Sequence, residues 1–352
     1  MALLDDLPLP IVQAPMAGGP STPELTAAVS GAGGLGFLGA GYKAVDAVRA
    51  DVEATRALTD RPFGVNVFAA GGEPADPAVV AAYAARLQAE AEGAGVALGE
   101  PRFDDDHLAG KLELLAELRV AVVSFTFGLP TGEAVQRLRT AGCEVWITVT
   151  SPDEARAATA LEPDALVVQG VEAGGHRGVF VDDDDASDLT LLAALQLVGA
   201  AVGVPLVASG GIATGAAVGA ALVAGASAAQ VGTAYLLADE AGTSPAQRAA
   251  TATATPTALT RAFSGRLARG IVNRLHREHA AVAPRAYPEV HHLTTPLRAH
   301  GRATGDADVI NLWAGQAHAL ATPRPAAEIT RALAADARAA VAAVHARLSA
   351  RK

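Results

Sequence analysis

Eight short apolar runs recur along the chain, and each is followed by a stretch with helical character. The runs are IVQAPM (11–16), GLGFLGA (34–40), FGVNVFA (63–69), AVVSFTFG (121–128), EVWITVT (144–150), ALVVQG (165–170), PLVASGG (205–211) and AAQVGTAYL (228–236). Strands that alternate with helices predict a parallel sheet with right-handed crossovers. We therefore predict an α/β fold. Eight units favour a closed (β/α)8 TIM barrel over an open sheet, although the count alone does not close the sheet.

Two segments exceed what a barrel needs. Residues 70–120 contain two helical stretches, 77–92 and 106–118, and residues 239–322 carry mixed helical and polar sequence. The stretch 325–349 has apolar residues near helical spacing, which predicts the last barrel helix. These residues are Ile329, Leu333, Val341, Val344 and Leu348. We predict a barrel of residues 1–238 and 323–352 with a helical insertion at about 70–120. Residues 239–322 are then an inserted, mainly helical substrate or cap domain at the carboxyl mouth of the barrel.

Composition narrows the classes of partner. The net charge is −10 and the chain has no lysine- or arginine-rich block, which argues against nucleic acid and anionic membranes as partners. The lone Cys143 excludes an intrachain disulfide and a cysteine-based zinc site. The N-terminal MALLDDLPLP lacks the basic residues of a signal peptide. We expect a cytoplasmic protein, and the chain leaves open whether it forms a homodimer.

Residues 189–238 contain no charged side chain and are long enough to cross a membrane twice. Gly203, Pro205, Gly210, Gly211 and Gly215 divide this segment into pieces of helix and strand length. Strands of a parallel sheet that is covered on both faces also appear as continuous apolar runs. We therefore assign the segment to the barrel and not to a membrane.

Two glycine turns follow the last two predicted strands. In a TIM barrel the active site lies at the carboxyl ends of the strands, and phosphate commonly binds after strands 7 and 8. The turns here are Ser209-Gly210-Gly211 and Gln230-Val231-Gly232-Thr233. Glycine lets the backbone approach an anion closely, so this pair predicts a phosphate site. The competing interpretation is a pair of tight turns without a ligand.

The segment VEAGGHRG (171–178) follows the sixth predicted strand. Gly174 and Gly175 permit close contact with a ligand, and Ala173 keeps the wall small. His176 is then placed at the mouth, where it could act as a base or as a hydrogen-bond donor to an anion. A structural or exposed histidine is the alternative. Asn66 and Gln169, near the ends of their strands, are either satisfied core amides or partners for a heterocycle.

Three other patterns carry less weight. His291-His292 has no acidic or thiol partner at ligand spacing, so we predict no metal site there. The acidic run Asp182–Asp185 lacks the glycine and glutamate of a calcium loop and reads as a solvated turn. The string GAGGLG (31–36) matches a dinucleotide fingerprint but leads into a strand, whereas that fingerprint follows a strand and opens a helix.

Seven segments together resemble the nitronate monooxygenase family, formerly called 2-nitropropane dioxygenases. They are QAPMAGG (13–19), PFGVNVF (62–68), GVEAGGHRG (170–178), SGGIATG (209–215), QVGTAYL (230–236), FSGRLARGIVNRL (263–275) and NLWAGQ (311–316). The order GGH, SGGI and GT is highly specific for flavin barrels of this superfamily. The sequence departs from the family at Ala229, where the family usually has a larger aliphatic residue. We expect this difference to affect packing more than chemistry.

The resemblance implies an FMN-binding TIM barrel that oxidises alkyl nitronates, such as propionate 3-nitronate, with O2 to a carbonyl compound and nitrite. It implies that His176 is the catalytic residue. The implied FMN-binding residues are Ala14, Pro15, Met16, Asn66, Gln169, Ala173, Gly174, Gly175, Ser209, Gly210, Gly211, Gln230, Gly232 and Thr233.

Three alternatives stay open at this point. The nearest is an FMN-dependent enoyl-acyl-carrier-protein reductase that uses NAD(P)H and shares the barrel and the histidine. NLWAGQ favours the nitronate enzymes over it. The others are a phosphate-sugar isomerase or lyase barrel without flavin, and a flavin-binding scaffold without turnover. The sequence also leaves open whether His176 removes a proton or holds a charge.

Overall fold

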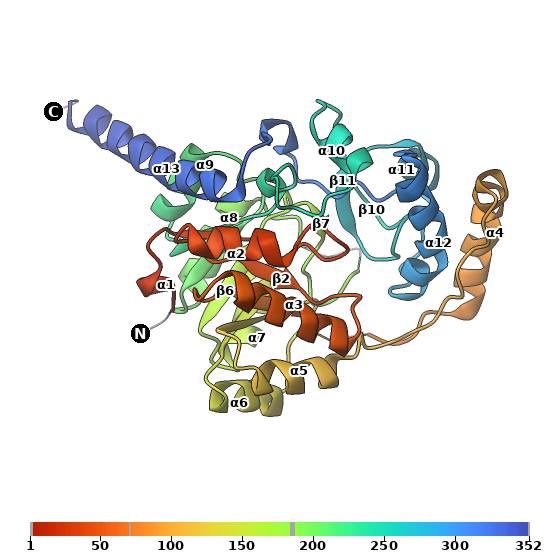
Figure 1. The fold of residues 1–352 in the computed structure, drawn as a ribbon, viewed down its shortest axis with the longest axis horizontal. Coiled ribbons are helices and arrows are strands. Elements are labelled where there is room, and N and C mark those ends of the chain that lie inside the picture. Colours follow the sequence, from red (N-terminus) through yellow and green to blue (C-terminus); the bar gives the residue numbers. More distant parts are fainter. Residues whose placement is uncertain (1–2, 70–71, 184–186, 351–352) are drawn as a thin grey trace.

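A computed structural model of the protein describes residues 3–69, 72–183 and 187–350 (Figure 1). Eight parallel strands form one sheet in the order β1-β9-β8-β6-β5-β4-β3-β2. A parallel bridge between Val12 and Leu35 joins its two edges and closes the barrel. The predicted TIM barrel is confirmed. The strands are β1 (Ile11–Gln13), β2 (Phe37–Gly39), β3 (Gly64–Phe68), β4 (Val122–Thr126), β5 (Glu144–Val149), β6 (Ala165–Gln169), β8 (Leu206–Ser209) and β9 (Ala228–Val231).

Several predicted runs are longer than the strands they contain, and the last one also includes a 3-10 turn. The run 228–236 is extended only to Val231, and Thr233–Tyr235 forms a 3-10 turn, η1. The chain turns there because it has reached the carboxyl mouth, where Gly232 ends the extended backbone.

Helices surround the barrel and cover its strands. They are α2 (Pro23–Gly31), α3 (Val45–Leu58), α5 (Leu108–Glu117), α6 (Gly132–Thr140), α7 (Pro152–Thr159), α8 (Leu191–Ala201), α9 (Gly215–Val223) and α13 (Ala326–Ser349), with the short α1 (Leu3–Asp6) at the start of the chain. Hydroxyl caps begin several of them: Ser151 accepts from the Glu154 amide at the start of α7, directly before Pro152. The segment predicted as the last barrel helix is α13, which packs against α9 and α2 and fills the remaining place in the ring (Figure 1).

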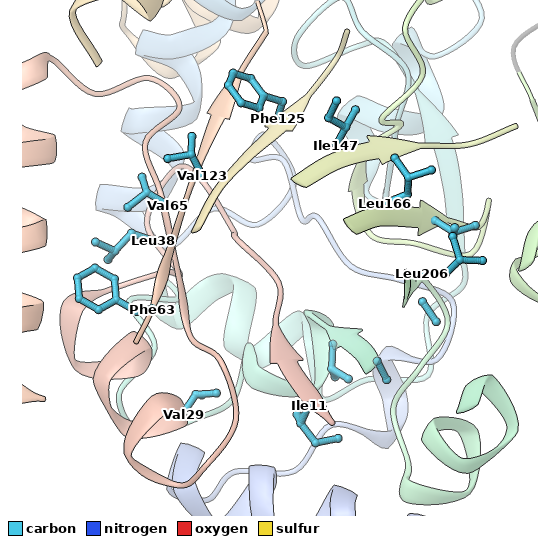
Figure 2. Packing of buried hydrophobic residues seen from close by; sticks show 14 of the residues in the cluster. Ile11, Val29, Leu38, Phe63, Val65, Val123, Phe125, Ile147, Leu166 and Leu206 are labelled. Atoms are coloured by element: carbon cyan, nitrogen blue, oxygen red, sulfur yellow. The ribbon is translucent and has the colours of Figure 1, made fainter. Parts of the chain in front are cut away.

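Strand alternation separates two buried layers. Outward residues such as Leu38, Val65, Val123, Ile147 and Leu166 pack against the surrounding helices (Figure 2). Residues of the opposite parity fill the barrel interior, among them Phe37, Val122, Trp146, Val167 and Val207. Successive side chains of a strand point to opposite faces, so the inner parity continues along each strand toward the mouth. Toward the mouth most of the inner residues are polar, namely Asn66, Ser124, Thr148, Gln169, Ser209 and Gln230. The alternation that seals one end of the barrel therefore places amides and hydroxyls at the other.

A second hydrophobic cluster lies outside the barrel. It contains residues of β11 (Ala268–Ile271), α11 (Arg274–His279) and α12 (Glu289–Thr304), and α10 (Pro245–Thr251) packs against it. β11 is the central strand of a three-stranded antiparallel sheet with β10 (Thr257–Thr260) and β7 (Gly175–His176), and a short 3-10 helix, η2, spans His318–Leu320. The helix α4 (Pro77–Ala94) packs on α12 through Val80, Tyr83 and Leu87, and it stands apart from the barrel helices in Figure 1. The two helices of the segment 70–120 therefore pack in different places. α4 packs in the second cluster, whereas α5 packs between α3 and α6 of the barrel.

The charge-free segment 189–238 holds α8, β8, α9 and β9. Within the described ranges, no helix combines the length and the apolar character needed to cross a membrane.

Candidate active site

A cavity of about 380 Å³ opens at the carboxyl ends of the strands. All fifteen residues named from the sequence line it: Ala14, Pro15, Met16, Asn66, Gln169, Ala173, Gly174, Gly175, His176, Ser209, Gly210, Gly211, Gln230, Gly232 and Thr233. They come from the ends of β1, β3, β6, β8 and β9 and from β7 and its flanking turn. The structure therefore brings these dispersed residues to one place.

The turns after β8 and β9 are tied to each other and to a distant loop. Gln230 Nε2 donates to Ser209 Oγ at 3.4 Å. Thr233 Oγ1 accepts from the Gly315 amide at 3.0 Å, which attaches the loop 311–316 to the β9 turn. This network holds the glycine turns as part of the cavity wall.

The two predicted amides serve the barrel as well as the cavity. Asn66 Nδ2 lies 2.9 Å from Ser124 Oγ and 3.0 Å from Thr126 Oγ1. Gln169 Nε2 donates to the His176 carbonyl at 3.1 Å, and its Oε1 accepts from Arg177 Nη1 at 2.9 Å and from the Gly178 amide at 2.8 Å. Gln169 thereby fixes the turn that carries His176.

His176 lies in a two-residue strand and not in a free loop. β7 pairs antiparallel with β11, with His176 opposite Ala268. The segment VEAGGHRG therefore joins the barrel to the antiparallel sheet. Pairing with a strand some ninety residues later has no local sequence signal, which is why only a loop was expected.

Gly174 and Gly175 serve different purposes. A Cβ on Gly174 would lie 2.5 Å from the carbonyl carbon of Ala314 and from the amide nitrogen of Gly315. Gly175 has open space around its Cα but adopts a φ of +76°, in the left-handed region that favours glycine. The first glycine admits the loop 311–316, and the second turns the chain into β7.

The imidazole of His176 contacts Ser264 and three aromatic rings. Its Nε2 lies 2.8 Å from Ser264 Oγ, and that hydroxyl lies 3.3 Å from the carbonyl of Arg266. When the hydroxyl donates to this carbonyl, it accepts from Nε2–H, which leaves the lone pair on Nδ1. The rings of Trp313, Phe127 and Tyr287 have centroids at 5.4, 5.7 and 5.8 Å from the imidazole.

Burial, together with the nearby cations Arg266 and Arg298, lowers the pKa of His176 to about 3. The imidazole is therefore neutral near pH 7. It is available as a hydrogen-bond donor or acceptor, and it supplies no positive charge to the cavity.

Several lining residues had not been assigned to the site from the sequence. They are Tyr42, Phe127, Ser264, His291, Arg298, Arg302, Asn311 and Trp313. Ser264 and Trp313 belong to the segments FSGRLARGIVNRL and NLWAGQ. These segments indicated the family resemblance but did not indicate what the two residues do. Arg298 and Arg302 had no local signal, because arginines are common along this chain. Among the described residues they are the only Arg, Lys, Asp or Glu side chains in the lining.

The patterns given less weight are now placed. The His291 ring stacks on Tyr42 at 3.9 Å, while His292 Nε2 lies 2.8 Å from Asp104 Oδ2. In the acidic run, Asp182 accepts from Arg261 and from the Leu267 amide, so for this residue the solvated turn was wrong. Asp184 and Asp185 lie outside the described residues. The segment 31–36 leads into β2 as expected.

The described residues contain one carboxylate–histidine group with the spacing of a metal site, formed by Glu90, Glu278 and His279. Arg274 bonds to both carboxylates, at 2.6 Å from Glu90 and 2.9 Å from Glu278. A guanidinium thus already supplies the positive charge that a metal ion would bring.

The cavity fits FMN in size and in chemistry. A volume of about 380 Å³ is within the range of cofactor sites. The glycine turns allow a phosphate to approach the backbone, and no carboxylate of the described lining would repel it. The polar inner residues near the strand ends offer donors and acceptors to the edge of a heterocycle.

Comparison with known proteins identifies a family for this chain. A sequence model of the family described as "Nitronate monooxygenase" matches residues 2–336. A nitronate monooxygenase of Pseudomonas aeruginosa is 42% identical over 336 residues, which cover 92% of this chain and 95% of that protein. The structure of a nitroalkane oxidase from Streptomyces ansochromogenes superposes with a TM-score of 0.94 at 48% identity, over 98% of this chain and 100% of that one. FabK from Thermotoga maritima superposes less well, with a TM-score of 0.78 at 25% identity over 98% of each chain.

Proposed function

The chain belongs to the nitronate monooxygenase family, and from this premise we propose that it catalyses the FMN-dependent oxidation of alkyl nitronates by O2. The products would be a carbonyl compound and nitrite. Atoms and charge balance when two nitronates and one O2 give two carbonyl molecules and two nitrite ions. The observation that carries the proposal is one cavity, without a carboxylate in its described lining, that joins the glycine turns to a neutral His176.

We propose that Gly210, Gly211, Gly232 and Thr233 hold the phosphate end of FMN. The remaining predicted residues would border the ring and the ribityl chain. They are Ala14, Pro15, Met16, Asn66, Gln169, Ala173, Gly174, Gly175, Ser209 and Gln230. Bound FMN would supply the redox chemistry, taking an electron from the nitronate and passing it to O2.

His176 would position the substrate as a neutral group. A nitronate has already lost its α-proton, so its binding needs a hydrogen-bond partner more than a base. If a neutral nitroalkane enters, Nδ1 is the atom that would accept the proton, because Nε2 is engaged with Ser264. The rings of Phe127, Tyr287 and Trp313 would exclude water around this atom.

We also propose that residues 239–322 act as a cap that selects the substrate, with residues 1–238 and 323–352 as the FMN-binding barrel. The pairing of β7 with β11 supports this division of roles, because it attaches the histidine of the barrel to a strand of the cap. We further propose that α4 of the 70–120 insertion joins this cap, because it packs on α12.

The decisive experiment is anaerobic reduction of the purified holoenzyme. We expect propionate 3-nitronate to bleach the flavin absorbance and NADH to leave it unchanged. Bleaching by NADH and not by the nitronate would instead indicate an enoyl-acyl-carrier-protein reductase. A colourless preparation that releases no flavin on heating would refute both redox functions.

A further inference from the structure

A second cavity, of about 630 Å³, adjoins the cavity that contains His176. The two cavities share several lining residues, among them Tyr42 and Phe127. The second cavity is bordered by residues that follow β2, by residues 102–107 of the 70–120 insertion and by the start of α12. The two spaces are therefore neighbours that share one wall.

Two aromatic rings of that wall separate His176 from the second cavity. Phe127 and Tyr287 contact the imidazole with centroids at 5.7 and 5.8 Å, and both line the second cavity. The guanidinium carbon of Arg266 lies 4.1 Å from the centroid of the Phe127 ring, and Arg266 also lines the second cavity. A small molecule that leaves the neighbourhood of His176 past these rings therefore arrives at Arg266.

Arg266 presents an unpaired donor to this cavity. It is 7% exposed, and among the described residues no carboxylate lies within salt-bridge distance of it. The acidic residue that acts on it most is Asp182, which already pairs with Arg261 at 2.9 Å. Its Nε and Nη2 donate to the carbonyls of Arg177 and Val179. Its Nη1 makes no hydrogen bond to a described residue, and it is not among the buried atoms that are closed off from solvent.

The hydroxyl of Tyr42 supplies a second donor. Tyr287 Oη donates to Tyr42 Oη at 3.2 Å, so this bond does not use the Tyr42 hydrogen, and no described residue accepts it. Burial raises the pKa of Tyr42 to about 12, so the hydroxyl keeps its hydrogen near neutral pH. The positive charge of Arg266 is close enough to act on the pKa of both phenols. Because Tyr42 lines both cavities, its hydroxyl lies where one cavity meets the other.

The other Asp, Lys and Arg residues in the described lining of the second cavity have partners or face water. The close pairs are Lys43–Asp51, Arg102–Asp104, Asp104–His292 and Lys111–Asp106. Asp105 is exposed, and its carboxylate accepts from the His107 amide at 3.1 Å. A buried guanidinium and a phenol that both lack an acceptor favour a small anion with oxygen acceptors.

We propose that Arg266 and Tyr42 bind the nitrite product as it leaves the active site through the second cavity. The inference rests on the proposed function, which forms nitrite beside His176, and it adds an exit on the side of Phe127 and Tyr287. Nitrite has two oxygen acceptors, one for Arg266 Nη1 and one for the Tyr42 hydroxyl. Because nitrite leaves by its own opening, it does not have to pass the next nitronate as that substrate enters.

The kinetic test is inhibition of the holoenzyme by sodium nitrite, with propionate 3-nitronate as the substrate. Nitrite in the second cavity does not occupy the place of the substrate, so it should lower kcat even at saturating nitronate. An anion that competes for the active-site cavity has no effect under that condition. Full activity at saturating nitronate and high nitrite would therefore overturn the proposal.

Variants identify the residues that hold the anion. Arg266→Gln should raise the nitrite inhibition constant at saturating nitronate by about 10- to 100-fold, because it removes a hydrogen bond between two charged groups. Tyr42→Phe removes one hydroxyl and keeps the ring that stacks on His291, so it should raise the constant by about 2- to 10-fold. Tyr42→Phe also keeps the proposal testable if Arg266→Gln does not fold.

Arg102→Gln is the matched control. It removes the same charge from the lining of the same cavity, but from an exposed side chain that pairs with Asp104 at 3.4 Å. We expect this variant to keep the wild-type inhibition constant. An unchanged constant in both Arg266→Gln and Tyr42→Phe, or an equal rise in Arg102→Gln, would refute the site.

Equilibrium binding separates this inference from the proposed function. The affinities of nitrite and of inorganic phosphate for the FMN-loaded protein are measured by calorimetry without a nitronate. If Arg266→Gln weakens nitrite binding and no nitronate is oxidised, the anion site stands and only the proposed function fails. Equal nitrite affinity in the wild type and Arg266→Gln would refute the site and leave nitronate oxidation standing. Tighter binding of phosphate, with the same dependence on Arg266, would assign the site to a phosphate group, and the proposal would be wrong.

Discussion

Gly174→Ala tests how the histidine turn is built. The added methyl group would lie 2.5 Å from the Ala314 carbonyl carbon and 2.8 Å from the Ala314 Cα, where no side chain can rotate away. The opposing loop is also fixed on both sides, because the Gly315 amide donates to Thr233 Oγ1 and the Gln316 amide donates to the Glu172 carbonyl. The backbone of the loop must therefore move, or the substituted turn must.

The expected cost follows from this geometry. Overpacking in a close-packed region typically costs about 1–3 kcal/mol, and contact with fixed backbone places Gly174→Ala toward the upper part of that range. The loop carries Trp313, whose ring centroid is 5.4 Å from His176, so kcat/KM should fall along with stability. Urea denaturation measures the first effect as a lower midpoint at an unchanged slope.

Gly93→Ala is the control. Gly93 lies in α4 with nothing within 4 Å of its added Cβ, so alanine should stabilise the helix by about 0.5–1 kcal/mol. If Gly174→Ala had the same urea midpoint and the same activity as the wild type, the close contact between the Gly174 turn and the loop 311–316 would be refuted.

Three further predictions concern the histidine and its surroundings. His176→Asn should keep FMN and lose most activity, and full activity would remove the histidine from the mechanism. Ser264→Ala removes a 2.8 Å hydrogen bond to His176 that contributes about 0.5–1.5 kcal/mol, so kcat should fall roughly 2- to 10-fold with the flavin spectrum preserved, and Ser264→Thr should recover it. Burial lowers the pKa of His176 to about 3 and of His291 to about 2, so below pH ~6.5 the unfolded chain binds more protons than the folded one. The stability of the cofactor-free protein should therefore be greatest above that pH and fall as the pH drops toward 3, and a urea midpoint equal at pH 7 and pH 4.5 would contradict this.

The barrel could be predicted because its information is local. Each strand shows as an apolar run between glycines and prolines, and each helix follows within a few residues. The inner parity of β6 and β8, which fills the barrel with Val167 and Val207, also aims Gln169 and Ser209 at the mouth. The alternation of inward and outward residues along a strand therefore predicts part of the site as well as the core.

The missing part of the site depends on contacts between distant segments. β7 exists because β11 pairs with it, and Ser264 reaches His176 only because of that pairing. Arg298 lines the cavity only because α12 packs over the barrel mouth, and a one-dimensional pattern cannot show that. Such residues follow from the tertiary packing of the 239–322 segment, whose elements are short and weakly periodic.

The question left open for His176 was whether it removes a proton or holds a charge. A histidine that holds an anion by charge needs a pKa near or above neutrality, whereas burial and two arginines keep this one neutral. The positive charge of the cavity resides instead on Arg298 and Arg302. An anionic substrate would then be attracted by the arginines and oriented by the imidazole, and the same arginines that attract it keep the imidazole unprotonated. On this account attraction and orientation are carried by different side chains, and loss of His176 should affect every nitronate.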